Sequence, residues 1–177
     1  MHARQTAYSL YELLMTLAIF ATVMTLGLPA FGEIVASHRI RVEIDALFHA
    51  IHLARKESVV RRRVVTICPS RDGQICDQTL DWSNGWIMFA NHDRSSAQTR
   101  DDGEPVLRRS KVRKGVRIST NRRSFSLRST ELRATNGTLV FCDSADRVPP
   151  RALVVSYTGR PRVASKNTRG QPYECAH

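Results

Sequence analysis

The residues best suited to chemistry in this sequence are arginines, and two of them flank a proline near the C-terminal end. Gly159 permits a turn, and Pro161 biases the preceding Arg160 toward an extended backbone. Side chains two residues apart in an extended segment project to the same side, so Arg160 and Arg162 are predicted to form a two-pronged cationic fork. Such forks contact phosphates without reading bases. The alternative is a solvated, arginine-rich turn.

Further basic residues lie before and after this fork. Lys166 and Arg169 follow it on a polar tail. A second basic stretch, residues 108–133, holds ten Lys and Arg residues against one acid, and most of these charges are expected on an exposed sheet face. Four of its residues could widen a phosphate-binding track: Arg108, Arg109, Lys111 and Arg113.

The charge of the chain is concentrated after its first 35 residues. From Ala36 to the end there are 26 Lys and Arg residues, of which four are lysine, against 14 Asp and Glu. Arginine suits phosphate recognition because its planar fork can bind two oxygens at once. Anionic partners are therefore expected, and nucleic acid, lipopolysaccharide and membrane headgroups all qualify.

The four cysteines are Cys68, Cys76, Cys142 and Cys175, and their even number favours disulfides if this region is exported to an oxidising compartment. Three pairings are possible. In one of them Cys68 and Cys76 close a small polar loop, which leaves Cys142 to clasp Cys175 near the C-terminus. Zinc is the competing interpretation, but the sequence has no C-x-x-C pair, so no metal site is predicted.

Catalytic motifs are missing from the sequence. It contains no G-x-S-x-G, H-E-x-x-H or phosphate-binding P-loop pattern, and no Ser, His and Asp set is marked out by local context. We therefore expect neither enzymatic activity nor a cofactor.

A long N-terminal helix must support the rest of the chain. Residues 13–30 carry no charge over 18 positions, just enough for a transmembrane helix, so residues 8–32 are predicted to be its membrane-spanning half. Glu12 stands at the edge of this span. Residues 33–62 are predicted to be an amphipathic half, because apolar residues recur at three- and four-residue steps. They are Ile40, Ile44, Leu47, Ile51 and Ala54.

The remaining residues, 63–177, read as a head of short strands and turns. The candidate strands are rich in β-branched and aromatic residues and are bounded by Gly, Pro, Asn and Asp. They cover residues 64–68, 86–90, 106–108, 116–119, 124–128, 138–142 and 152–157. We expect antiparallel sheets packed on the amphipathic half of the helix, which is an α+β fold.

The N-terminal run A-Y-S-L-Y-E-L-L, with Pro29 beyond it, resembles the class III signal of type IV pilins and pseudopilins. The resemblance implies that residues 1–7 are a leader and that a prepilin peptidase cuts between Ala7 and Tyr8 and methylates the new amine. Glu12 would then pair with the Tyr8 amine of a neighbouring pilin in a filament. It also implies a single-pass inner-membrane protein with a periplasmic head, later part of a pilus. Ala7 and Tyr8 stand where the family usually has glycine and phenylalanine.

The head resembles a narrower group, the GspH/FimT minor pilins and pseudopilins. The resemblance is carried by V-V-T-I-C-P-S-R-D-G-Q-I-C (64–76), W-S-N-G-W-I-M-F (82–89), E-P-V-L-R (104–108) and A-L-V-V-S-Y-T-G-R-P-R (152–162). It implies a type IV pilin-like fold. In FimT-like members a G-R-x-R element binds DNA for uptake in natural transformation, which implies that Gly159, Arg160 and Arg162 hold DNA here. The alternative is a structural minor pilin or type II secretion pseudopilin that primes filament assembly without binding DNA.

Overall fold

The computed structural model describes residues 9–92, 99–128 and 134–175 of the 177-residue chain, leaving out the side chains of residues 26–30. Ala7 and Tyr8, the predicted cleavage junction, lie outside the described residues. The chain divides into two compact units, Met1–Val35 and Ala36–His177.

The first unit contains the beginning of helix α1, which spans Leu10–Arg61. Ser9 caps this helix, since its Oγ accepts a hydrogen bond of 3.2 Å from the Glu12 backbone N–H. Large apolar side chains between Leu10 and Met24 are exposed. Over the described residues, no helix combines the length and the apolarity needed to cross a bilayer. The membrane-spanning half stays a prediction.

In the second unit, α1 buries one apolar stripe. Ile40, Ile44, Leu47, Ile51 and Ala54 are each at most 3% exposed. Their three- and four-residue spacing places them on a single face of the helix. The apolar stripe that the sequence predicts on this part of the helix is therefore confirmed.

Eight described strands follow the helix. They are β1 (Val64–Pro69), β2 (Trp86–Asn91), β3 (Val106–Ser110), β4 (Val116–Thr120), β5 (Phe125–Leu127), β6 (Gly137–Asp143), β7 (Arg151–Val155) and β8 (Pro161–Ala164). The first seven match the predicted strands to within two residues at each end. The sequence predicts an extended backbone around Arg160 and Arg162 but no strand there, because the four-residue run P-R-V-A of β8 is short and has no apolar alternation.

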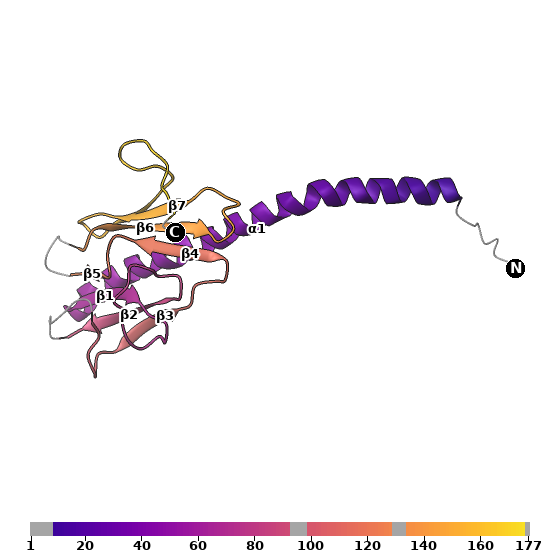
Figure 1. Ribbon diagram of the computed structural model, residues 1–177. Coiled ribbons are helices and arrows are strands. Elements are labelled where there is room, and N and C mark those ends of the chain that lie inside the picture. Colours follow the sequence, from indigo (N-terminus) through magenta and orange to yellow (C-terminus); the bar gives the residue numbers. More distant parts are fainter. Residues whose placement is uncertain (1–8, 93–98, 129–133, 176–177) are drawn as a thin grey trace, which may run out of the picture. The chain divides into compact units, whose positions relative to one another are not determined.

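The strands form two antiparallel sheets of four strands each. The first sheet has the order β3-β2-β1-β5, and the second has the order β4-β6-β7-β8. In Figure 1, β4, β6 and β7 lie together above β1, β2 and β3, and α1 passes behind both groups. The predicted α+β fold, a long helix packed on antiparallel sheets, is confirmed.

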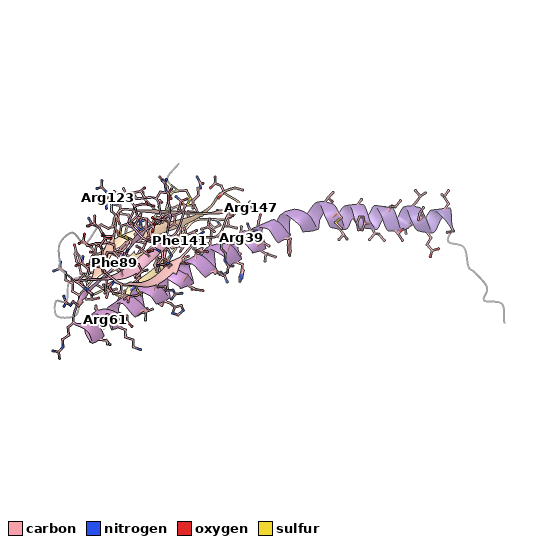
Figure 2. All side chains as sticks on the ribbon, turned by 90° about the horizontal axis from the view of Figure 1, so that it is seen from below. Arg39, Arg61, Phe89, Arg123, Phe141 and Arg147 are labelled. Atoms are coloured by element: carbon pink, nitrogen blue, oxygen red, sulfur yellow. A yellow bond between two sulfur atoms is a disulfide. The ribbon has the colours of Figure 1, made fainter. Side chains whose placement is uncertain are left out.

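One hydrophobic cluster joins the helix to both sheets. It includes Leu47 from α1, Ile67 and Phe125 from the first sheet, and Phe141 and Leu153 from the second. Inward and outward residues alternate along β4 and most of β6, as expected for sheets with one covered face. Figure 2 shows Phe141 within this crowded interior.

Two disulfides cross-link the head, so the prediction of disulfide bonds is confirmed. Cys68 is bonded to Cys76, and Cys142 is bonded to Cys175. Cys142 follows the inward-facing Phe141 in β6, so it faces away from the core. The second disulfide therefore holds the C-terminal tail to the outer face of the second sheet.

Replacing both Cys142 and Cys175 by serine should lower the free energy of unfolding by about 3 kcal/mol, because the bond closes a long loop in the unfolded chain. Urea unfolding of the Ala36–His177 unit measures this change. The matched control replaces Cys68 and Cys76, which are 8 residues apart instead of 33, and should lower stability by less. Equal stability of the parent and the first variant would show that the tail bond contributes nothing.

The stability of the head depends on pH through one buried carboxylate, that of Asp143. The Asp143 side chain accepts hydrogen bonds of 2.7 and 2.8 Å from the Arg147 guanidinium, which hold the pKa of Asp143 below its ordinary value of 3.8. Stability from this pair is complete above pH 3.8 and is lost as the pH falls through the lower, folded-state pKa. Asp143→Asn should therefore cost about 2 kcal/mol at neutral pH, and the cost should shrink below pH 3.8 in urea unfolding across pH. A pH-independent difference would contradict this assignment.

Candidate nucleic-acid interface

The predicted cationic fork lies on a β-hairpin at the edge of the second sheet. Strands β7 and β8 pair antiparallel, with Val155 opposite Pro161 and Val154 opposite Arg162. β8 is the last strand of its sheet, where a proline is tolerated because an edge strand leaves some N–H groups unpaired. The sequence G-R-P-R thus forms the end of the hairpin loop and the start of an edge strand.

Local hydrogen bonds close the hairpin loop, which runs from residue 156 to residue 160. The Ser156 N–H donates to the Arg160 carbonyl at 3.1 Å, and the Gly159 N–H donates to the Ser156 carbonyl at 2.9 Å. The Ser156 hydroxyl accepts a further bond of 3.2 Å from the Arg160 N–H. The position of Arg160 is therefore set by the loop backbone.

Gly159 is required at its position for two separate reasons. Its φ of +69° lies in the left-handed region, which side chains disfavour. A Cβ atom there would also lie 3.1 Å from Leu127 Cδ2 and 3.2 Å from Ala134 Cβ. The absence of a side chain lets the loop pack directly on the body of the head.

Two long-range hydrogen bonds hold the same loop in place. The Arg55 Nη1 group, on α1, donates to the Thr158 carbonyl at 2.8 Å. The Ala134 N–H donates to the Tyr157 carbonyl at 2.7 Å. This role of Arg55 is not predictable from the sequence, because nothing in the spacing of a polar helix residue identifies a partner 103 positions away.

Both arginines of the fork are available to a ligand. Arg160 and Arg162 are exposed, and Pro161 between them is buried. This alternation in exposure is the pattern of two side chains on one side of an extended segment. In the part of the chain that the structure describes, neither guanidinium forms an ion pair or a hydrogen bond.

Lys166 and Arg169 lie on a second, smaller turn beyond β8. Lys166 pairs with Pro172 in an isolated bridge, and the Asn167 side-chain oxygen accepts hydrogen bonds from the N–H groups of Arg169 and Gln171. Lys166 and Arg169 are both exposed. In Figure 1 the yellow loop that follows the orange strands projects beyond β7.

Two residues of the second predicted basic set lie on the other sheet. Arg108 and Arg109 are in β3, the edge strand of the first sheet, and Lys111 follows it. The Arg108 guanidinium lies 5.8 Å from the centre of the Trp86 ring, and Arg109 Nη2 donates to Gln74 Oε1 at 3.3 Å. Arg108 and Arg109 therefore lie on a different sheet from the hairpin.

Arg113 has a structural partner within the head. Its backbone N–H donates to Glu43 Oε1 at 3.2 Å, and its Nε lies 3.8 Å from the same oxygen. Burial raises the pKa of Glu43, while the Arg113 N–H and charge act in the opposite direction. Arg113 therefore compensates a buried helix carboxylate, a role that its sequence context does not predict.

The remaining predicted sites divide between described and undescribed residues. Glu12 is exposed in the first turn of α1. Its predicted partner is the Tyr8 amine of a neighbouring pilin, and Tyr8 and Ala7 lie outside the described residues. Among residues 9–92, 99–128 and 134–175, no three His, Cys, Asp or Glu side chains gather as metal ligands.

Comparisons with known proteins agree with this architecture. The family model described as type II transport protein GspH matches residues 43–159. No curated protein sequence matches the chain significantly. Among solved structures, the type IV minor pilin FimU of Pseudomonas aeruginosa is similar with a TM-score of 0.55 and 18% identity, over 79% of this chain and 97% of FimU.

Two further solved structures have the same fold. The minor pseudopilin EpsH of the Vibrio cholerae type 2 secretion system matches with a TM-score of 0.51 and 9% identity, over 71% of this chain and 96% of EpsH. GspH of Escherichia coli matches with a TM-score of 0.52 and 15% identity, over 76% of this chain and 94% of that protein. The family model covers well over half of the sequence, and the chain is therefore a type IV pilin-like member of the GspH family of minor pilins and pseudopilins.

Proposed function

We propose that this chain is a minor type IV pilin that binds extracellular DNA, without sequence preference, for uptake in natural transformation. The observation that carries the proposal is the pair Arg160 and Arg162, both exposed and without an acidic partner among the described residues. They lie on a hairpin that Arg55, Ala134 and Gly159 fix to the head.

A fixed hairpin suits phosphate binding for a physical reason. An arginine side chain loses rotational freedom when it binds, but the hairpin backbone is already ordered and adds little further cost. Contacts to phosphate oxygens position a duplex without reading its bases. Lys166 and Arg169, on the neighbouring turn, supply further positive charge for the same backbone.

The remaining parts of the proposal concern the helix. The exposed apolar side chains at the beginning of α1 support an inner-membrane anchor with a periplasmic head, followed by incorporation into a pilus at the cell surface. A prepilin peptidase would cut between Ala7 and Tyr8. Glu12, exposed in the first helical turn, would then pair with the free amine of another pilin in the filament.

A second candidate function is purely structural. The matching family model is described as a type II transport protein, and the fold is shared with the pseudopilin EpsH. A pseudopilin or tip pilin that primes filament assembly needs the helix but not the exposed arginines of the hairpin. The two candidates therefore differ in what the hairpin variants should do.

Reversing the charge of Arg160 and Arg162 to glutamate should remove most DNA binding, because two phosphate contacts become repulsive. Titration of a labelled duplex at several salt concentrations measures this, and three or four neutralised phosphates give the parent a slope of log affinity against log salt of roughly −3. The matched control is Arg41→Glu with Arg71→Glu, which removes the same charge from other exposed positions.

The same variants separate the two candidate functions in cells. Loss of transformation with pili intact supports the DNA-binding role. Normal transformation with the Arg160 and Arg162 variants, in a strain that loses piliation or secretion when the whole gene is deleted, supports the structural role. Unchanged DNA affinity in vitro would remove both arginines from the binding site.

Gly159→Ala should weaken DNA binding although it leaves every arginine in place. The new Cβ contacts Leu127 and Ala134. The alanine also has to adopt a left-handed φ, which costs about 1–2 kcal/mol, so the hairpin is displaced. Urea unfolding and duplex titration measure the two effects. The control is Gly170→Ala, which has a similar φ of +78° but open space around its Cβ. Reduced stability with unchanged DNA affinity would show that binding does not depend on the position of the hairpin.

A further inference from the structure

Helix α1 ends among three consecutive arginines that the proposed site does not use. Arg61, Arg62 and Arg63 line an open hollow of about 370 Å³ together with Val64, Asn91 and His92. All three arginines are exposed, and Figure 2 shows Arg61 at this end of the helix.

The backbone at Arg62 is in a conformation that glycine would adopt more easily. Arg62 has a φ of +52°, its N–H donates to the Val59 carbonyl, and the next N–H, of Arg63, donates to the Ser58 carbonyl. These two bonds form a Schellman motif, in which the left-handed position is usually glycine. An arginine held there against its steric preference points to a use for its side chain.

Counted over the residues that the structure describes, the hollow retains a positive charge. Arg61 pairs with Glu57 at 2.7 Å, whereas Arg63 donates to the uncharged His92 carbonyl at 2.6 Å. The Arg62 side chain has neither an ion pair nor a hydrogen bond within the described ranges. Two uncompensated arginines outweigh the helix C-terminus, whose dipole is equivalent to about −0.5 charge.

The hollow and the residue that contacts the hairpin, Arg55, lie within two turns of each other at the end of α1. Arg55 fixes α1 beside the hairpin through the Thr158 carbonyl. Arg61, the last residue of α1, follows Arg55 by six residues, which is about 9 Å along the helix axis at 1.5 Å per residue, and Arg62 comes next. One DNA strand advances about 3.4 Å for each phosphate, so this separation corresponds to about three phosphates.

We propose that the Arg61–Arg63 hollow is a second phosphate-binding site, with Arg62 as its principal cation, and that it receives a backbone phosphate of DNA already held by the hairpin. The inference rests on the proposed DNA-binding function and extends its footprint along α1. It explains why an arginine occupies a left-handed helix cap.

The test uses the full chain in a non-ionic detergent, with Arg62→Gln as the variant and Arg41→Gln as the charge-matched control. The probe is a short duplex of mixed sequence, titrated between about 50 and 200 mM salt. Arg62→Gln should weaken binding about tenfold and make the salt slope shallower by about 0.9, since one phosphate contact is lost. Arg41→Gln should leave both values near those of the parent chain.

A second variant distinguishes loss of binding from loss of folding. Arg62→Gly relieves the backbone strain, so it should keep or raise stability and still lose affinity.

Further outcomes separate the second site from the proposed DNA-binding function. Full affinity in both Arg62 variants, with binding lost on Arg160→Glu and Arg162→Glu, overturns the second site and leaves the proposed function standing. A chain that binds no DNA overturns both. If Arg62→Gln weakens binding to vesicles of anionic lipid but not to DNA, the hollow serves a lipid surface and the present assignment is wrong.

Discussion

Burial of one apolar stripe on helix α1 is the interaction on which the rest of the head depends. Ile44, Leu47 and Ile51 contribute to a single cluster that also contains residues of both sheets. Each such side chain contributes roughly 1.5–3 kcal/mol when it is fully buried. Because neither sheet can cover its inner face alone, the helix is the common surface on which both assemble. The hairpin that carries Arg160 is held in place through that same helix.

The proposed binding surface depends on this packing through a short series of contacts. The helix presents Arg55 to the Thr158 carbonyl, and the packing of Leu127 and Ala134 leaves room only for a glycine at position 159. The hairpin is therefore part of the folded body, although its outer side chains are solvated. The tail beyond it is tied down separately by the disulfide between Cys142 and Cys175. The proposed DNA-binding site gains from this rigidity, because only side chains need to be ordered on contact.

The basic residues of this chain do not form one uniform surface. Arg147 is paired with the buried Asp143, and Arg113 lies against the buried Glu43, so part of the positive charge balances interior carboxylates. Arg108 lies over Trp86 on the first sheet. What remains without acidic partners among the described residues includes Arg160, Arg162 and Arg62. Net charge alone therefore overstates the area available to an anionic partner.

The sequence by itself determined the features that depend on local pattern. The three- and four-residue spacing of Ile40 to Ala54 predicts the helix face, and the β-branched runs predict seven of the eight strands, because periodicity records which side of an element is buried. The same local reasoning predicts a turn at Gly159 and places the Arg160 and Arg162 side chains on the same side of an extended segment. Only the tertiary structure decided which partners distant residues acquire: Arg55 with Thr158, Arg113 with Glu43, and the strand β8 with β7. These contacts depend on how the helix and the sheets pack in three dimensions. The spacing of residues along the chain does not specify which distant residues meet.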